Sequence, residues 1–284
     1  MTKFQLNNFA IDNFIISALK EDMFYGDITT DAICANLDNP QFEVYLKTRQ
    51  DGVLCGCDVF KRVFELLNQD VKVEFYFKDG DTIKSGNTIA KIKGGARYIL
   101  SGERLALNFM QKMSGIATSA RKFQEKIDKY GAKIVDTRKN TPNFRIFEKY
   151  SVSIGGNYVH RFNLSDCVML KDNHIALYGG SITRAVNEIR KTLSHSHKIE
   201  VECDSIEQVK EALKCGVDII MLDNMTVDKM NEAVKIVGKK AITEASGCVT
   251  LDNIEEIAKT GVDIISTSAI VMKANTLDLG FDYN

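Results

Sequence analysis

The chain has 284 residues, of which 44% are hydrophobic and 26% are charged, as in a globular protein with a buried core. Its 37 basic and 38 acidic residues give a net charge of −1, which excludes a general nucleic-acid-binding surface. Apolar runs reach only about half a dozen residues, so neither a membrane span nor a secretion signal is expected. We expect a cytoplasmic protein whose seven dispersed cysteines are free thiols.

The first part of the chain predicts helices mixed with short strands. Apolar residues recur at helical spacing in residues 11–20, and apolar and polar residues alternate in 42–46 and 71–77, as in half-buried strands. Residues 97–113 predict an amphipathic helix. We expect Ser114 and Gly115 to interrupt this helix before it resumes.

From residue 133 onward, short apolar runs alternate mostly with helical stretches such as 205–214 and 251–260. This alternation favours a parallel sheet, and a closed or nearly closed α/β barrel more than an open doubly wound sheet. No Gly-x-Gly-x-x-Gly turn follows any of the runs, so a dinucleotide-binding fingerprint is missing. The six predicted strands are 133–136, 167–170, 198–201, 218–222, 241–243 and 263–266.

Cationic side chains gather at the first two strand ends and in the loop between them. The carboxyl ends of parallel barrel strands meet at one face, where active sites form. Burying unpaired cations costs several kcal/mol each, so anions should complete this site. Two arginines favour planar, bidentate partners such as carboxylates or phosphates. The cationic residues are Arg138, Lys139, His160, Arg161 and Lys171.

The later strand ends carry acidic and small polar residues. Glu202 and Asp223 beside a phosphate site suit Mg²⁺, which keeps waters and takes other ligands from substrate. Glu244 is expected at the fifth strand end. The hydroxyls and backbone N–H groups of Ser246-Gly247 and Thr267-Ser268 fit a terminal phosphate. The predicted substrates are therefore a polycarboxylate and a phosphorylated sugar that carries further phosphates.

An ordered set of motifs resembles the quinolinate phosphoribosyltransferase family over nearly the whole chain. Each motif alone is weak, but the ordered set is specific. The motifs are residues 26–30 (GDITT), 103–109 (ERLALNF), 113–118 (MSGIAT), 136–142 (DTRKNTP), 160–161 (HR), 170–174 (LKDNH), 201–202 (VE), 221–224 (MLDN) and 244–247 (EASG).

The resemblance implies an N-terminal α/β sandwich domain followed by an incomplete, TIM-like parallel α/β barrel. The sandwich would span residues 1–112 and be joined by residues 273–284, and the barrel would span 113–272. It also implies a homodimer with shared active sites, or a higher oligomer of it. The expected reaction joins quinolinate to 5-phosphoribosyl 1-pyrophosphate (PRPP) with Mg²⁺, and gives nicotinate mononucleotide, pyrophosphate and CO₂ in NAD biosynthesis.

The resemblance also assigns roles to residues. Quinolinate would be held by four residues of one chain and by Arg104 of the other. Lys139, Glu202 and Asp223 would serve PRPP, with the two carboxylates holding the metal. Together with Lys171, these three are the expected catalytic residues. The expected quinolinate ligands are Arg138, His160, Arg161 and Lys171, and those of the PRPP 5-phosphate are Ser246, Gly247, Thr267 and Ser268.

Four positions depart from the family pattern, namely Asn157, Val159, Cys248 and Ser268. Two other functions remain open from the residues. A Schiff-base aldolase would use Lys171 or Lys139 as nucleophile and would be trapped by borohydride. A catalytically retired sensor of phosphoribosyl ligands would be expected to have lost a metal carboxylate or a cationic ligand.

Overall fold

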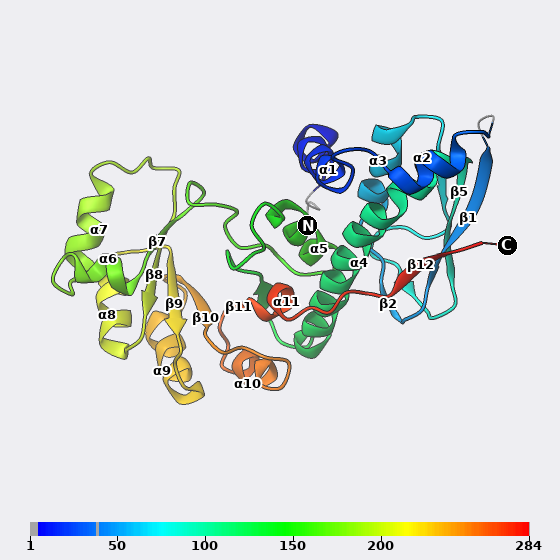
Figure 1. Cartoon of the computed structure of the whole chain (residues 1–284). Coiled ribbons are helices and arrows are strands. Elements are labelled where there is room, and N and C mark those ends of the chain that lie inside the picture. Colours follow the sequence, from blue (N-terminus) through cyan, green and yellow to red (C-terminus); the bar gives the residue numbers. More distant parts are fainter. Residues whose placement is uncertain (1–4, 38–39, 284) are drawn as a thin grey trace. The chain divides into compact units, whose positions relative to one another are not determined.

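The computed structural model describes residues 5–37 and 40–283. The chain forms two compact units, the first from Met1–Arg121, Thr141–Gly156 and Ala274–Asn284, and the second from Lys122–Asn140 and Asn157–Lys273. This division differs from the expected boundary at residue 112, because helix α4 (Ala96–Ile127) runs through that position without a break. Figure 1 labels the elements along the chain.

An antiparallel sheet forms the centre of the first unit, with strand order β12-β1-β5-β3. From Val44 onward every second residue of β1 is buried, as the predicted alternation requires, so Val44 and Leu46 face the core. The C-terminal strand β12 pairs with β1 in the same unit. The strands of this unit are β1 (Gln41–Thr48), β2 (Gly52–Val53), β3 (Lys72–Phe75), β4 (Thr82–Ile83), β5 (Thr88–Gly95) and β12 (Leu279–Asp282).

Helix α3 packs its aromatic residues against this sheet. Phe60 and Phe64 are fully buried, and their rings lie 6.1 and 6.5 Å from the ring of Phe281 on β12. The predicted helix at residues 11–20 lies inside α1 and is confirmed. Besides α4, the helices of the unit are α1 (Asn8–Asp22), α2 (Ile28–Cys34), α3 (Cys57–Leu67) and α5 (Arg145–Ile154).

The expected interruption of α4 at Ser114 and Gly115 is wrong. The helix continues because tertiary contacts use both residues. The Ser114 hydroxyl accepts the Cys55 N–H at 3.0 Å and donates to the Cys55 carbonyl at 3.1 Å. A Cβ atom at Gly115 would lie 1.9 Å from the carbonyl oxygen of Asn275, so glycine permits a close backbone approach inside an intact helix.

Six parallel strands form the sheet of the second unit, in the order β6-β11-β10-β9-β8-β7. Each predicted strand overlaps an observed one, so the parallel α/β prediction is confirmed. Strands β6 and β7 are the two edges of this sheet within the described residues, which makes the barrel incomplete. The strands are β6 (Lys133–Val135), β7 (Val168–Leu170), β8 (Ile199–Cys203), β9 (Ile219–Asp223), β10 (Ile242–Ser246) and β11 (Ile264–Ser266).

Helices follow the strands of this sheet along the chain (Figure 1). In the described residues, no helix combines the length and the apolar character needed to cross a bilayer. All seven cysteines are free, as expected. The helices that begin in this unit are α6 (Asp172–Ala176), α7 (Ile182–Arg190), α8 (Ile206–Lys214), α9 (Val227–Val237), α10 (Ile254–Lys259) and α11 (Ala269–Met272).

Candidate active site

A cavity of about 1130 Å³ lies within the second unit at the carboxyl ends of its parallel strands. Because neighbouring strands end at the same edge of the sheet, residues far apart in the sequence meet there. Eleven of the predicted site residues line this cavity: Arg138, Lys139, His160, Arg161, Lys171, Glu202, Asp223, Ser246, Gly247, Thr267 and Ser268. Arg104 does not line it, since it lies on α4 in the first unit with an exposed side chain.

The cationic wall comes from the segments that follow β6 and flank β7. Arg138 and Lys139 follow β6 and are exposed, whereas Lys171 precedes α6 and is half-buried. The Arg161 guanidinium donates to the Cys167 carbonyl at 2.7 Å and approaches the sulfur of Met169 at 3.6 Å. These two contacts leave further guanidinium N–H groups for an anion in the cavity.

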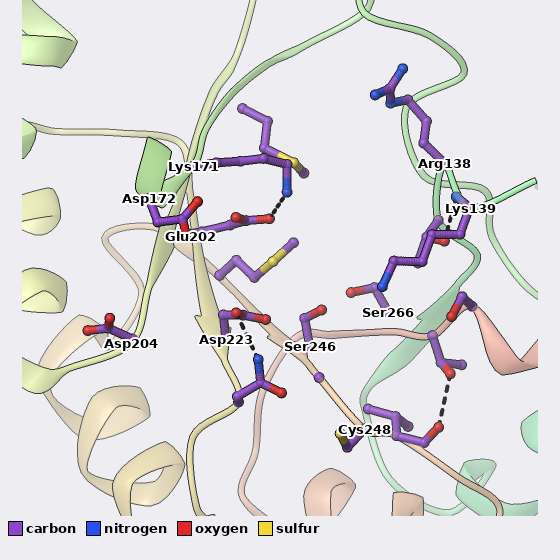
Figure 2. A pocket seen from close by; sticks show the side chains of 18 of the residues that line it. Arg138, Lys139, Lys171, Asp172, Glu202, Asp204, Asp223, Ser246, Cys248 and Ser266 are labelled. Atoms are coloured by element: carbon purple, nitrogen blue, oxygen red, sulfur yellow. Dashed lines mark hydrogen bonds and ion pairs between the residues drawn. The ribbon is translucent and has the colours of Figure 1, made fainter. Parts of the chain in front are cut away.

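Two half-buried carboxylates lie on adjacent strands. Glu202 is on β8 and Asp223 ends β9, and the two strands pair in register. Lys171 forms an ion pair with Glu202, and the two side chains point toward each other in Figure 2. Asn224 donates to the Asp223 carboxylate at 2.9 Å. Oxygen donors facing one cavity are the ligands that Mg²⁺ takes from proteins, so these residues fit the expected metal.

The end of β10 forms a tight cradle with the end of β9. Ser246 pairs in register with Asp223, and its carbonyl accepts the Asn224 N–H at 2.9 Å. Gly247 has φ +99°, and a Cβ atom there would lie 2.2 Å from Oδ1 of Asn224. Cys248 has φ 49°, a left-handed conformation that favours glycine. The backbone of this turn therefore depends on a glycine at position 247.

The last strand end contributes Thr267 and Ser268 to the same cavity. The Thr267 hydroxyl accepts the Ala269 N–H and donates to the Val249 carbonyl, both at 3.1 Å, so it also fixes the local backbone. The neighbouring Ser266 was missed by sequence reasoning. Its hydroxyl is buried in the cavity wall without a hydrogen-bond partner among the described residues.

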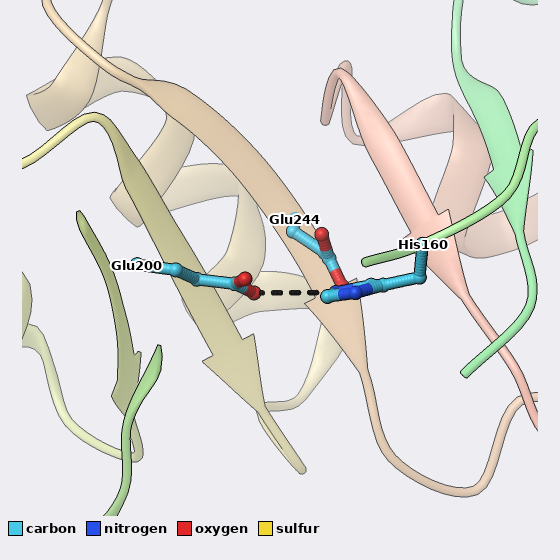
Figure 3. Close-up of side chains that lie close together, drawn as sticks. All are labelled: His160, Glu200 and Glu244. Carbon is cyan, nitrogen blue, oxygen red and sulfur yellow. Dashed lines mark ion pairs between the residues drawn. The ribbon is translucent and has the colours of Figure 1, made fainter. Parts of the chain in front are cut away.

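A buried cluster of one histidine and two glutamates lies inside the barrel (Figure 3). Nε2 of His160 lies 3.3 Å from Oε1 of Glu244 and 3.6 Å from Oε1 of Glu200. Both glutamates are at most 2% exposed. Burial opposes a charge on the His160 ring, but the facing carboxylates outweigh burial and shift the pKa of His160 upward.

The other ring nitrogen of His160 faces the backbone. Nδ1 accepts the Arg161 N–H at 2.7 Å, as the neutral ring with its proton on Nε2 does. Burial and the Glu244 charge raise the pKa of Glu200, while His160 opposes this change. A proton taken up by the cluster therefore lies on the carboxylate side, between Nε2 and the two glutamates.

The expected place of Glu244 at a strand end is wrong, since it lies within β10 and is buried. Ser246, two residues later, faces the same side and lines the cavity. Glu200 and Glu202 are related in the same way on β8. Glu200 was missed, although a glutamate between Ile199 and Val201 inside an apolar run was a usable signal, because buried carboxylates are rare without partners.

An incomplete parallel α/β barrel with cations, two carboxylates on adjacent strands and a Ser-Gly turn around one cavity defines an enzyme that acts on anionic substrates. Two family models match this chain: "Quinolinate phosphoribosyl transferase, N-terminal domain" over residues 27–114 and the corresponding "C-terminal domain" over residues 116–282. The chain belongs to the quinolinate phosphoribosyltransferase family.

Individual relatives agree with this assignment. A probable nicotinate-nucleotide pyrophosphorylase (carboxylating) of Bacillus subtilis is 38% identical over 277 residues, covering 98% of this chain and 94% of that protein. One of Archaeoglobus fulgidus is 42% identical, covering 90% and 97%. The crystal structure of NadC from Streptococcus pyogenes superposes with a TM-score of 0.94 at 40% identity, covering 99% of this chain and 98% of that one.

Proposed function

We propose that this chain catalyses the reaction of quinolinate with PRPP to give nicotinate mononucleotide, pyrophosphate and CO₂, a step of NAD biosynthesis. The observation that supports this most is a single cavity that combines cations for carboxylates with a carboxylate pair and a Ser-Gly turn for a phosphorylated sugar. The relatives described above carry the name of this activity.

The cationic wall suits quinolinate, which carries two carboxylates on a pyridine ring. Arg138 and Arg161 offer planar donor pairs, and Lys171 adds a third cation on the same cavity. Binding by these groups would place the ring nitrogen beside C1 of the ribose. Such positioning alone can supply a large share of the rate enhancement.

The other half of the cavity suits PRPP. We assign Glu202 and Asp223 as the ligands of Mg²⁺, which when bound would neutralise charge on the pyrophosphate. Lys139 would stabilise the negative charge that the leaving pyrophosphate gathers. The turn of Ser246 and Gly247 would hold the 5-phosphate through its hydroxyl and backbone N–H groups, assisted by Thr267 and Ser268.

The chemistry needs no protein nucleophile. The bond between C1 and the pyrophosphate oxygen breaks with both electrons on oxygen, and the quinolinate nitrogen forms the new bond to C1. The pyridinium ring then accepts the electron pair of the bond to the 2-carboxylate, which leaves as CO₂. The ring carbon takes a proton from water or from Lys171.

We further propose that the enzyme is a cytoplasmic homodimer with shared active sites. Arg104 is exposed on α4, as a residue that reaches the partner's quinolinate must be. Exposed apolar residues around α2 supply surface that a partner subunit would cover, with Phe24 75%, Tyr25 91% and Ile28 80% exposed. The free cysteines fit a reducing compartment.

Incubation of the purified protein with quinolinate, PRPP and MgCl₂ tests the proposed reaction. We expect nicotinate mononucleotide by chromatography, and no product when either PRPP or Mg²⁺ is omitted. The Lys139→Ala variant is the control for contaminating activity, because it should lower the rate at least about 100-fold. Absence of product from the folded wild-type protein would refute the proposed function.

A further inference from the structure

The buried cluster joins His160, an expected quinolinate ligand, to Glu200 and Glu244, which have no role in the reaction described so far. Glu200 lies two residues before Glu202 on β8, and Glu244 lies two residues before Ser246 on β10. Both glutamates are therefore buried beneath the cavity that we propose binds the anionic substrates. Negative charges buried there would repel quinolinate if they acted on it directly. Any effect of these glutamates on quinolinate binding therefore acts through the residues that they contact.

The imidazole of His160 connects these glutamates to the cationic wall. Nε2 faces both carboxylates, and Nδ1 accepts the Arg161 backbone N–H at 2.7 Å. The His160 backbone N–H donates to Asp136 at 2.8 Å, directly after β6. The ring therefore joins β8 and β10 to the backbone of Arg161.

Arg161 needs such support because no regular element holds it. It lies in the irregular segment between α5 and β7, and its guanidinium contacts only a carbonyl oxygen and a thioether in the described residues. Neither contact fixes the direction of the guanidinium as a carboxylate would. The backbone position of Arg161 consequently decides where its remaining N–H groups point.

We infer that Glu200 and Glu244 are positioning residues that act through His160 to hold Arg161 in place for a carboxylate of the substrate. The inference rests on the proposed function, and it gives His160 a positioning role beside the quinolinate contact expected from the sequence. The same histidine and carboxylate atoms lie within 4.8 Å of one another, so a buried metal ion is the competing explanation.

The first test is calorimetric quinolinate binding to Glu200→Gln and Glu244→Gln, with Glu207→Gln as control because Glu207 is exposed on α8. We expect each buried variant to bind quinolinate about 10-fold more weakly, as when the outer partner of a ligand histidine is removed. The KM for quinolinate should rise likewise, while kcat and the KM for PRPP change by less than about threefold. The control should match the wild type.

Other outcomes would overturn the inference. Tighter quinolinate binding by the glutamine variants would mean that the glutamates act only as repulsive charges. Unchanged binding, or a loss of melting temperature with no selective effect on quinolinate, would mean that they only support the fold. Wild-type protein that binds no quinolinate at all would instead refute the proposed function.

A double-mutant cycle tests the route through His160. In a His160→Phe background, Glu244→Gln should change quinolinate binding by less than about twofold, because its effect needs the imidazole. Equal losses in both backgrounds would show that Glu244 acts independently of His160 and would overturn the inference. So would stoichiometric zinc in the wild-type protein, measured by elemental mass spectrometry, that Glu200→Gln and Glu244→Gln lose.

Discussion

Four carboxylates on the strands near the cavity differ in how deeply they are buried. Glu202 and Asp223 are half-buried on the cavity wall, where an incoming cation can reach them, whereas Glu200 and Glu244 are at most 2% exposed and face a histidine. Strand alternation places both layers on one side of the sheet. Whether a glutamate of this sheet can bind an incoming cation therefore depends on how deeply it is buried. The residue type alone does not reveal this.

The two half-buried carboxylates should affect one substrate selectively. We expect Glu202→Ala and Asp223→Ala to weaken PRPP binding in the presence of Mg²⁺ by about 100-fold, because each change removes a metal ligand. Quinolinate binding should change by less than about threefold, since its cations remain. Calorimetry with each substrate measures both, and loss of quinolinate binding with normal PRPP binding would contradict the assigned roles.

The buried cluster should make stability depend on alkaline pH. The facing carboxylates raise the pKa of His160 above its usual 6.5, so the stabilising contribution of the protonated cluster is present below pH 6.5 and is lost as pH rises through the raised pKa. Between pH 7 and 10 we expect the free energy of unfolding to fall more in the wild-type protein than in the Glu200→Gln/Glu244→Gln double variant. Urea unfolding at both pH values measures this, and parallel changes would contradict it.

Secondary elements were predictable where the sequence is periodic. The parallel strands of the second unit are short apolar runs that alternate mostly with helical stretches, and each was predicted from that pattern. The break in α4 was wrongly predicted, because local helix propensity does not reveal that Asn275 and Cys55 use Gly115 and Ser114 for close contacts. Eleven predicted residues line the cavity because they lie near the carboxyl ends of strands or in the loop before β7. Glu200 was missed because it lies deeper within β8, and Ser266 was missed although it ends β11.

The turn after β10 should tolerate no side chain at position 247. Gly247→Ala adds a Cβ atom 2.2 Å from Oδ1 of Asn224, so the turn must shift. We expect PRPP binding to weaken by about 10-fold or more. Gly86→Ala is the matched control, because Gly86 also has positive φ but nothing within 4 Å of the added atom. Equal PRPP affinity of the Gly247→Ala variant and the control would contradict the role of this turn.

At the scale of the whole molecule, the sequence indicated two parts, and the structure divides the chain into two compact units. Their boundaries could not be predicted to the residue, because α4 continues past residue 112 and because residues 141–156 belong to the first unit. A single chain also does not show whether Arg104 serves its own active site or that of a partner subunit. The proposed dimer gives this question a direct experimental form.

Subunit complementation tests the shared site. Arg104→Ala and Lys171→Ala should each be nearly inactive as homodimers. A mixed dimer has one site with both changes and one with neither, so it should regain about half of the wild-type activity per dimer. Mixed dimers isolated by two different affinity tags provide the measurement. If they stay inactive, although subunit exchange is verified and the sites act independently, the shared-site proposal is wrong.

The most direct test of the proposed reaction traces the 2-carboxylate of quinolinate, which should leave as CO₂. Quinolinate labelled with ¹³C in its 2-carboxylate is incubated with PRPP, Mg²⁺ and the wild-type protein, and labelled CO₂ and nicotinate mononucleotide are measured together. We expect equal amounts of both products, formed only when PRPP is present and lost in the Arg161→Ala variant. Label retained in the nucleotide, or CO₂ released without PRPP, would contradict it.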